Sequence, residues 1–89
     1  MMKKGLLIEN KLGLHARAAA QIVKTSSGYA SKITLSKDGL DVDGKSIMGI
    51  MMLAAAKGSS VLVSVEGDDE GNALEGLERL FKDRFGEKE

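Results

Sequence analysis

The sequence predicts one α/β (α+β) domain, in which a four-stranded antiparallel sheet is covered on one face by three helices. Three observations support this fold class. Four short stretches are predicted as strands with an apolar face, and two of them, Ser31–Ser36 and Ser60–Val65, alternate apolar and polar residues. Three stretches with helical spacing complete the order β-α-β-β-α-β-α. No linker or long repeat interrupts the 89 residues, so residues 1–89 form a single open-faced sandwich.

The first strand and the first helix are predicted from the N-terminal third of the chain. We expect a strand over Lys3–Glu9 and a loop over residues 10–14. From Ala16 onward, apolar residues recur at the spacing of one helix face. This helix is expected to end near Ser27, with Gly28 as its left-handed cap.

The middle of the chain contains a hairpin and a short helix. Ser31–Ser36 alternates, the pair Asp38-Gly39 is typical of a two-residue hairpin turn, and Leu40–Val42 returns as the partner strand. A short helix is expected over Ile47–Leu53.

The last strand and the last helix follow. Ser60–Val65 alternates again, and Asp68 or Asp69 is expected to cap the final helix. That helix is expected to end at Gly86, with the last three residues frayed. Its apolar face carries Leu74, Leu77, Phe81 and Phe85.

The candidate site lies where the first helix begins. His15 is the only histidine of the chain, and Arg17 follows it within the first turn. The backbone N–H groups of Ala16 and Ala18 are unpaired at such a helix start, where the helix dipole also favours an anion. Since Arg17 adds donors suited to phosphate oxygens, we interpret His15 as a residue that takes up a phosphoryl group and passes it on. The alternative is a surface histidine that only caps the helix.

Composition narrows the classes of partner. Residues 1–45 carry eight Lys or Arg and four Asp or Glu, whereas residues 46–89 carry five and nine, so the halves are +4 and −4. The half with His15 therefore favours an acidic protein partner, and the three aromatic residues disfavour nucleic acid. With no cysteine and one histidine, no metal site is predicted. No signal peptide or membrane span is recognised, so we expect a cytoplasmic protein.

Two motifs carry a resemblance to a known family. Residues 13–17 read GLHAR and residues 45–49 read KSIMG, and their separation resembles that in HPr, the histidine-containing phosphocarrier of the phosphoenolpyruvate-dependent sugar phosphotransferase system. The resemblance covers essentially the whole chain. It implies that Enzyme I phosphorylates His15 on Nδ1 and that a IIA-type protein accepts the phosphoryl group. It also implies a carrier rather than an enzyme, with no cofactor.

One residue departs from the family pattern. Ala18 stands where the family usually has proline, and the chain contains no proline. Proline suits the first turn of a helix because the N–H that it lacks is unpaired there. Alanine restores that donor, so we expect the chemistry to survive. The departure favours, as the alternative, a regulatory or nitrogen-branch paralogue that acts through phosphorylation-dependent partner binding.

Ser46 is expected to cap the short helix in either case. The resemblance implies regulatory phosphorylation at Ser46, with HPr kinase/phosphorylase as a further partner. A phosphate there would meet helix N–H groups and Lys45. A regulatory binding module, with His15 secondary, is the competing hypothesis.

A docking surface beside His15 is expected on the short helix. Ile47, Met48 and Met51 share one side of it, and methionine adapts to partners of different shapes. The alternative is ordinary core packing, which we favour for Ile50 and Leu53. The remaining predicted partner-binding residues are Ala20, Lys24 and Lys45, the two lysines at the rim.

Overall fold

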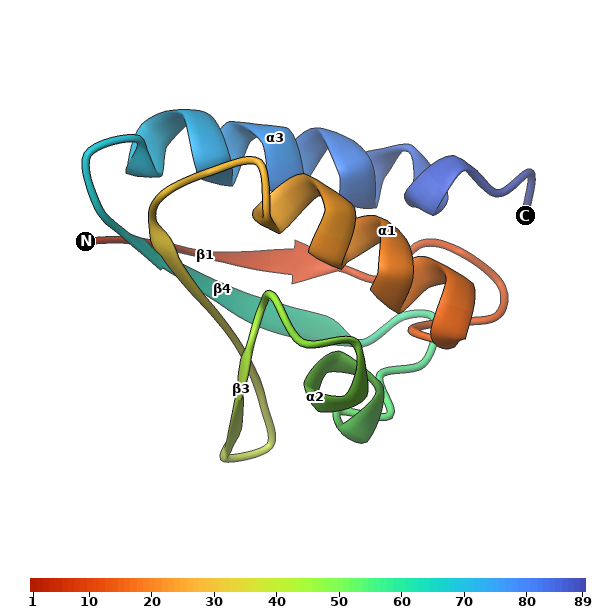
Figure 1. Cartoon of the computed structure of the whole chain (residues 1–89). Helices are drawn as coiled ribbons and strands as arrows, with labels where there is room; N and C mark the ends of the chain where they lie inside the picture. The colour runs from red at the N-terminus through yellow and green to blue at the C-terminus, as the bar shows by residue number, and fades with distance from the viewer.

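The computed structural model describes all 89 residues, which form a four-stranded antiparallel sheet with three helices on one face (Figure 1). The strands are β1 (Met2–Leu7), β2 (Lys32–Lys37), β3 (Leu40–Asp43) and β4 (Ser60–Glu66). The helices are α1 (Ala16–Ser26), α2 (Ile47–Met52) and α3 (Glu70–Lys82), and a 3₁₀ turn, η1 (Arg84–Gly86), follows α3. The predicted fold class and element order are confirmed.

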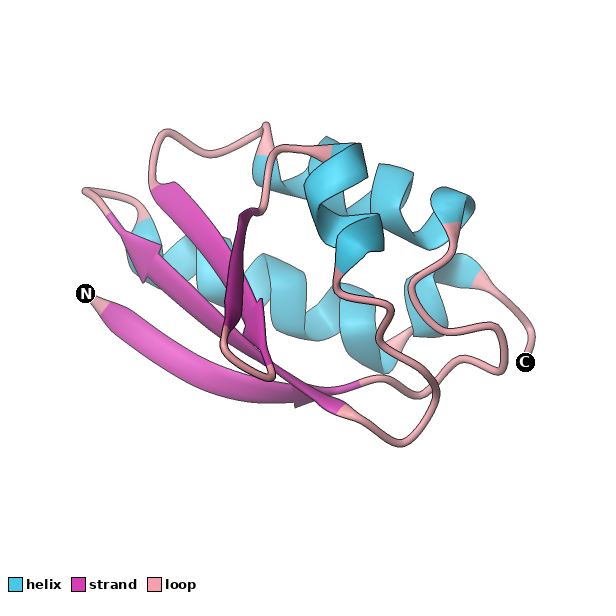
Figure 2. Ribbon diagram, turned by 90° about the horizontal axis from the view of Figure 1, so that it is seen from below, coloured by secondary structure: helices cyan, strands magenta, loops and turns pink.

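The sheet has the order β1-β4-β2-β3, so the last strand in sequence lies between the first two (Figure 2). Its register places Leu6 of β1 opposite Val61 of β4. On the other side of β4, Ile33 and Leu35 of β2 lie opposite Val65 and Val63. All these side chains are buried, so the alternation in the sequence marks the face that the helices cover.

The helices close the core over that face. α3 packs on β1 and β4, and α1 contacts both α2 and α3. Phe81 of α3 and Phe85 of η1 pack edge to face, with ring centroids 4.9 Å apart. None of the helices has the length and apolar character that crossing a membrane requires.

In the first half of the chain one element boundary differs from the prediction by more than one residue, and one predicted cap is wrong. β1 ends at Leu7 rather than at Glu9. Gly28 does not adopt the left-handed conformation, and the prediction of a left-handed cap there is wrong. The N–H groups of Gly28 and Tyr29 donate to carbonyls three residues earlier, so the end of α1 tightens into successive turns. These turns satisfy the helix carbonyls without a left-handed residue.

The C-terminal segment differs most. α3 ends at Lys82 instead of Gly86, because Arg84 and Phe85 adopt left-handed backbone angles, with φ of 55° and 57°. The reversal lets Phe85 remain buried after the helix has ended.

The last three residues are not frayed. The guanidinium of Arg84 donates to the carbonyl of Lys88 at 2.9 Å, and the carbonyl of Glu89 accepts from the N–H of Lys11. The end of the chain therefore lies beside the loop between β1 and α1 (Figure 1).

The side chain of Asp69 does not cap the final helix as the sequence predicts. It precedes α3, but its carboxylate makes no bond to that helix. It accepts instead from the N–H groups of Ala30 and Ser31, at 2.8 and 3.0 Å, and from the Ser31 hydroxyl. The Ser31 hydroxyl and the Ala30 N–H lower the pKa of the Asp69 carboxyl below its usual 3.8.

Candidate functional site

The site is built around His15, which is the N-cap of α1. Its backbone is extended, with φ −78° and ψ 179°, and its carbonyl accepts the first helical hydrogen bond from Ala19 at 2.9 Å. Its ring Nδ1 accepts from the backbone N–H of Arg17 at 3.3 Å. The histidine therefore caps the helix through the same nitrogen that was predicted to take up phosphate.

The loop before His15 is fixed by close contact with the chain after α2. Gly13 has φ +67°, and a Cβ at this position would lie 2.5 Å from the carbonyl oxygen of Ala55. The same carbonyl accepts from the N–H of Leu14 at 2.9 Å. Only glycine combines this conformation with this approach, so Gly13 sets the place where His15 leaves the loop.

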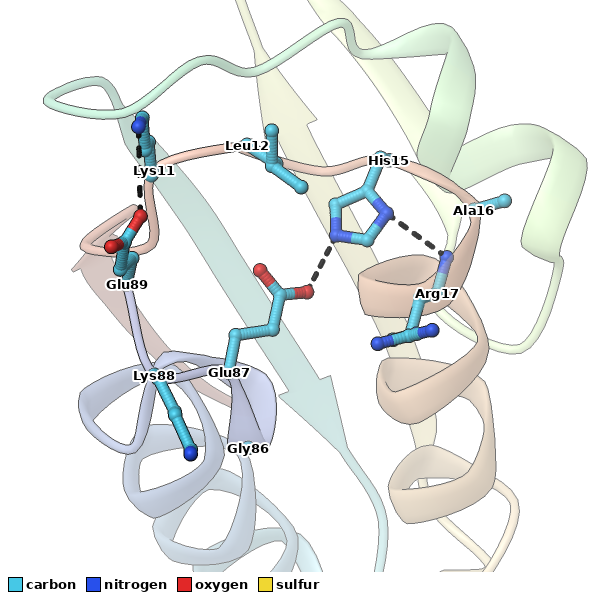
Figure 3. A pocket seen from close by; sticks show the side chains of 9 residues that line it. All are labelled: Lys11, Leu12, His15, Ala16, Arg17, Gly86, Glu87, Lys88 and Glu89. Carbon is cyan, nitrogen blue, oxygen red and sulfur yellow. Dashed lines mark hydrogen bonds and ion pairs between the residues drawn. The ribbon is translucent and has the colours of Figure 1, made fainter.

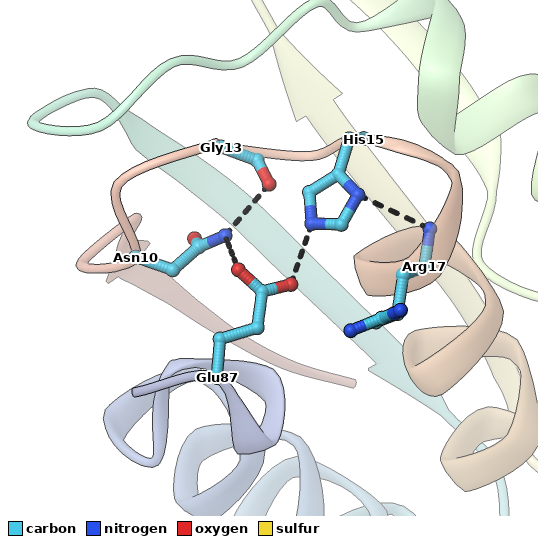
Figure 4. A network of polar contacts seen from close by, with 5 residues as sticks. All are labelled: Asn10, Gly13, His15, Arg17 and Glu87. Carbon is cyan, nitrogen blue, oxygen red and sulfur yellow. Dashed lines mark hydrogen bonds and ion pairs between the residues drawn. The ribbon is translucent and has the colours of Figure 1, made fainter. Parts of the chain in front are cut away.

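A carboxylate faces the other ring nitrogen. Oε2 of Glu87 lies 2.5 Å from Nε2 of His15, and Oε1 of Glu87 accepts from the amide Nδ2 of Asn10 at 3.0 Å. The same Nδ2 donates to the carbonyl of Gly13 at 2.8 Å (Figure 4). Asn10 is completely buried, while the side chains of His15 and Glu87 are 30% and 12% exposed.

These partners determine which nitrogen carries the proton. An N–H group donates to Nδ1, so Nδ1 presents a lone pair. A carboxylate lies against Nε2, so Nε2 carries the hydrogen. Nδ1, the nitrogen that faces the helix start, is therefore the ring nitrogen that presents a lone pair.

The carboxyl of Glu87 is held in its ionised form. Partial burial raises its pKa, but hydrogen bonds from Asn10 and His15 and the charges of His15 and Arg17 outweigh this effect. The net result is a pKa below the usual 4.5. At neutral pH a full negative charge therefore faces Nε2.

The start of α1 offers further donors for an anion. The N–H groups of Ala16 and Ala18 donate to no group of the protein. Ala16 is exposed, whereas Ala18 is completely buried, so of these two predicted donors only the Ala16 N–H lies at the surface. The guanidinium of Arg17 is exposed and lies over the same open hollow as the His15 ring (Figure 3). The hollow is lined by Lys11, Leu12, His15, Ala16, Arg17, Gly86, Glu87, Lys88 and Glu89.

The second motif forms a separate feature on α2. Ser46 is the N-cap that the sequence predicts, since its Oγ accepts from the N–H of Gly49 at 3.1 Å. Ile50 and Leu53 are buried, as expected, whereas Ile47, Met48 and Met51 are exposed, Met48 by 74%. Met52, which ends the same helix, is 66% exposed.

The other predicted partner-binding residues differ in their exposure. Ala20 and Lys24 are exposed on α1, the helix that contacts α2. Lys45 is half-buried, and its ammonium donates to the carbonyl of Tyr29 at 2.9 Å. None of these residues lines the hollow at His15, so the two motifs form neighbouring features rather than one pocket.

Asn10 and Glu87 were missed by the sequence analysis. Asn10 lies in a predicted loop, and Glu87 lies in a segment expected to be frayed. They are 77 residues apart, and neither belongs to a helix or strand pattern. The only indication in the sequence is Phe85, an apolar residue near the end of the chain that has to be buried.

Comparisons with known proteins agree with this geometry. A family model described as the PTS HPr component phosphorylation site matches residues 2–83. The phosphocarrier protein HPr of Xylella fastidiosa (strain 9a5c) is 48% identical over 87 residues, which are 98% of each chain. HPr of Cupriavidus necator is 46% identical, with both chains covered completely. The crystal structure of HPr-C-His from Thermoanaerobacter tengcongensis superposes with a TM-score of 0.95 at 46% identity, covering 100% of both chains. The chain therefore belongs to the HPr family, the phosphocarrier proteins of the phosphotransferase system, which carry a phosphoryl group and are not enzymes.

Proposed function

We propose that this protein accepts a phosphoryl group on Nδ1 of His15 from Enzyme I, with phosphoenolpyruvate as the source, and passes it to a IIA-type protein. The observation that carries the proposal is the position of Nδ1. It presents its lone pair at the start of α1, where Arg17 donates to it through the backbone N–H. The identity of both partners rests on membership of the family.

The geometry supports reversible loading. The Nδ1 bond to the Arg17 N–H is long, at 3.3 Å, so a phosphorus atom can displace it at little cost. The displaced N–H then faces the phosphoryl oxygens, together with the N–H group of the exposed Ala16. The guanidinium of Arg17 adds a charge-assisted donor at the rim. Each donor is exposed and worth only about 0.3–1 kcal/mol, so the group is stabilised but can still be released.

The partners are proposed to dock on the α2 surface. Ile47, Met48 and Met51 present exposed apolar side chains on a helix that contacts α1. Ala20 and Lys24 are exposed on α1, the helix that contacts α2, and the lysine supplies positive charge for an acidic partner. Lys45, which lies just before α2, is proposed to add positive charge at the rim of the docking surface, although its ammonium donates to the carbonyl of Tyr29.

Phosphorylation in vitro tests the central step. Incubation with Enzyme I and phosphoenolpyruvate is expected to add one acid-labile phosphoryl group, measured by intact mass. The H15A variant must show none, and circular dichroism confirms that it remains folded. R17A should load more slowly without losing stability. Acid-labile labelling of H15A would refute the assignment, because the chain has no other histidine.

Ser46 is proposed as a regulatory phosphorylation site for a serine kinase of the HPr kinase/phosphorylase type. Ser46 is half-buried at the N-cap, and its Oγ accepts a hydrogen bond from the N–H of Gly49. A phosphate there would add negative charge beside the apolar α2 surface and repel an acidic partner. This is also the feature on which a regulatory or nitrogen-branch paralogue would rely, and Ala18 at the place of the family proline favours that alternative.

Two variants separate charge from capping at Ser46. Asparagine and aspartate both serve well as N-caps, so S46N and S46D keep the helix start, and only S46D adds charge. We expect S46D to load from Enzyme I more slowly than S46N. Equal loading rates would show that charge at Ser46 does not regulate transfer.

A further inference from the structure

We propose that Glu87, held in place by Asn10, is a positioning residue that fixes the proton on Nε2 of His15 and balances the positive charge that the ring acquires when Nδ1 is phosphorylated. The inference rests on the proposed phosphoryl transfer. It assigns a role to a side chain that lies 72 residues from His15 in the sequence and outside both motifs.

The contacts form a continuous chain from the loop to the ring. The buried amide of Asn10 donates both to the Gly13 carbonyl and to Oε1 of Glu87. Oε2 of the same carboxylate then lies against Nε2 of His15 (Figure 4). Since both carboxylate oxygens are bonded, the carboxylate cannot rotate freely, and the ring is held in one orientation.

Glu87 is the only carboxylate placed to balance a positive charge on the His15 ring. Lys11, Arg17, Lys88 and Glu89 are the other charged residues that line the hollow. Glu89 pairs with the ammonium of Lys11 at 3.5 Å and makes no contact with the ring. The cations cannot balance a positive ring, so the only carboxylate that touches His15 is that of Glu87.

The transfer step shows where this charge is needed. The Nδ1 lone pair attacks the phosphorus atom, and the bond between phosphorus and the donor breaks, with its electron pair leaving on the donor. The proton on Nε2 stays, so the product is an N-phosphorylated imidazolium. When the acceptor takes the phosphoryl group, the electron pair of the P–N bond returns to Nδ1 and the ring is neutral again. A carboxylate at Nε2 stabilises the loaded ring and keeps its proton through both steps.

Two variants of Glu87 separate the acceptor from its charge. E87A removes the acceptor, and E87Q keeps an acceptor but removes the charge. The matched control is E75Q, which removes one exposed carboxylate that pairs with Arg79 on α3. Imidazole ¹⁵N chemical shifts report the ratio of the two neutral tautomers in the unphosphorylated protein, and this measurement needs no phosphoryl donor.

We expect E87A to lower the ratio of the Nε2–H to the Nδ1–H tautomer about tenfold, because a hydrogen bond to a charged group is lost. E87Q should keep most of this ratio. Both variants should load from Enzyme I about tenfold more slowly than E75Q, which should match the wild type. A ratio within twofold of wild type in E87A, or loading of both variants at the rate of E75Q, would overturn the inference. Failure of the wild type to load would instead overturn the proposed function. The tautomer ratios of the wild type and E87A would still test whether Glu87 fixes the proton on Nε2.

Discussion

Replacing Gly13 by alanine tests whether the loop before His15 is as tightly fixed as the structure shows. Gly13 combines a left-handed backbone, with φ +67°, and an approach of its would-be Cβ to within 2.5 Å of the Ala55 carbonyl oxygen. A methyl group cannot occupy that position, so the loop has to move away from residues 55–56.

The magnitude follows from three contributions. The left-handed conformation costs a non-glycine residue about 1–2 kcal/mol. Forcing an extra methyl group into a packed contact costs about 1–3 kcal/mol. If the loop yields, the hydrogen bond from the Leu14 N–H to the Ala55 carbonyl, 2.9 Å long, is weakened, at about 0.5–1.5 kcal/mol. The free energy of unfolding of G13A should therefore fall by about 2.5–6.5 kcal/mol.

Gly39 provides a matched control. It also has a left-handed backbone, with φ +82°, but a Cβ there meets nothing within 4 Å. G39A should therefore lose only the conformational term, about 1–2 kcal/mol. Urea unfolding followed by circular dichroism gives both values from the shift of the midpoint at constant slope. If G13A and G39A lose the same stability, the argument from close contact at Gly13 is refuted.

Three further predictions concern the rest of the fold. G71A should raise the free energy of unfolding by about 0.5–1 kcal/mol, seen as a higher melting temperature. Gly71 lies in the first turn of α3, and a Cβ added there would meet only Sδ of Met2, at 3.9 Å. An unchanged or lower melting temperature would contradict this. Asp69 has a lowered pKa in the folded protein, so its contribution to stability is present above pH 3.8 and is lost as the pH falls through the folded value. D69N should be less stable at neutral pH and should show a flatter pH dependence of urea unfolding below pH 3.8, and an unaltered acid profile would show that another group dominates. F85A should lose about 3–5 kcal/mol in thermal unfolding, because the ring is buried against Phe81. A melting temperature close to that of the wild type would show that the ring does not anchor the C-terminal segment.

Much of the candidate site was predictable because its parts are local. His15 as the first residue before a helix, and Ser46 as the cap of another, follow from residue types and periodicity over a few neighbouring positions. The burial of Ile33, Leu35 and Ile50 followed from the same patterns. The prediction of a left-handed cap at Gly28 was wrong because α1 ends in turns with hydrogen bonds to carbonyls three residues earlier. The local sequence does not determine which of these two helix ends forms.

The sequence by itself determined the order of the elements, the apolar face of each, and the helix start that holds His15 and Arg17. These depend on interactions within a few residues along the chain. Only the tertiary structure decided that Glu87 faces Nε2 of His15 and that Asn10 holds it there. That meeting requires the chain to reverse at Arg84 and Phe85, against their backbone preference, and what stabilises the reversal is the burial of Phe85 in a core assembled from the whole chain.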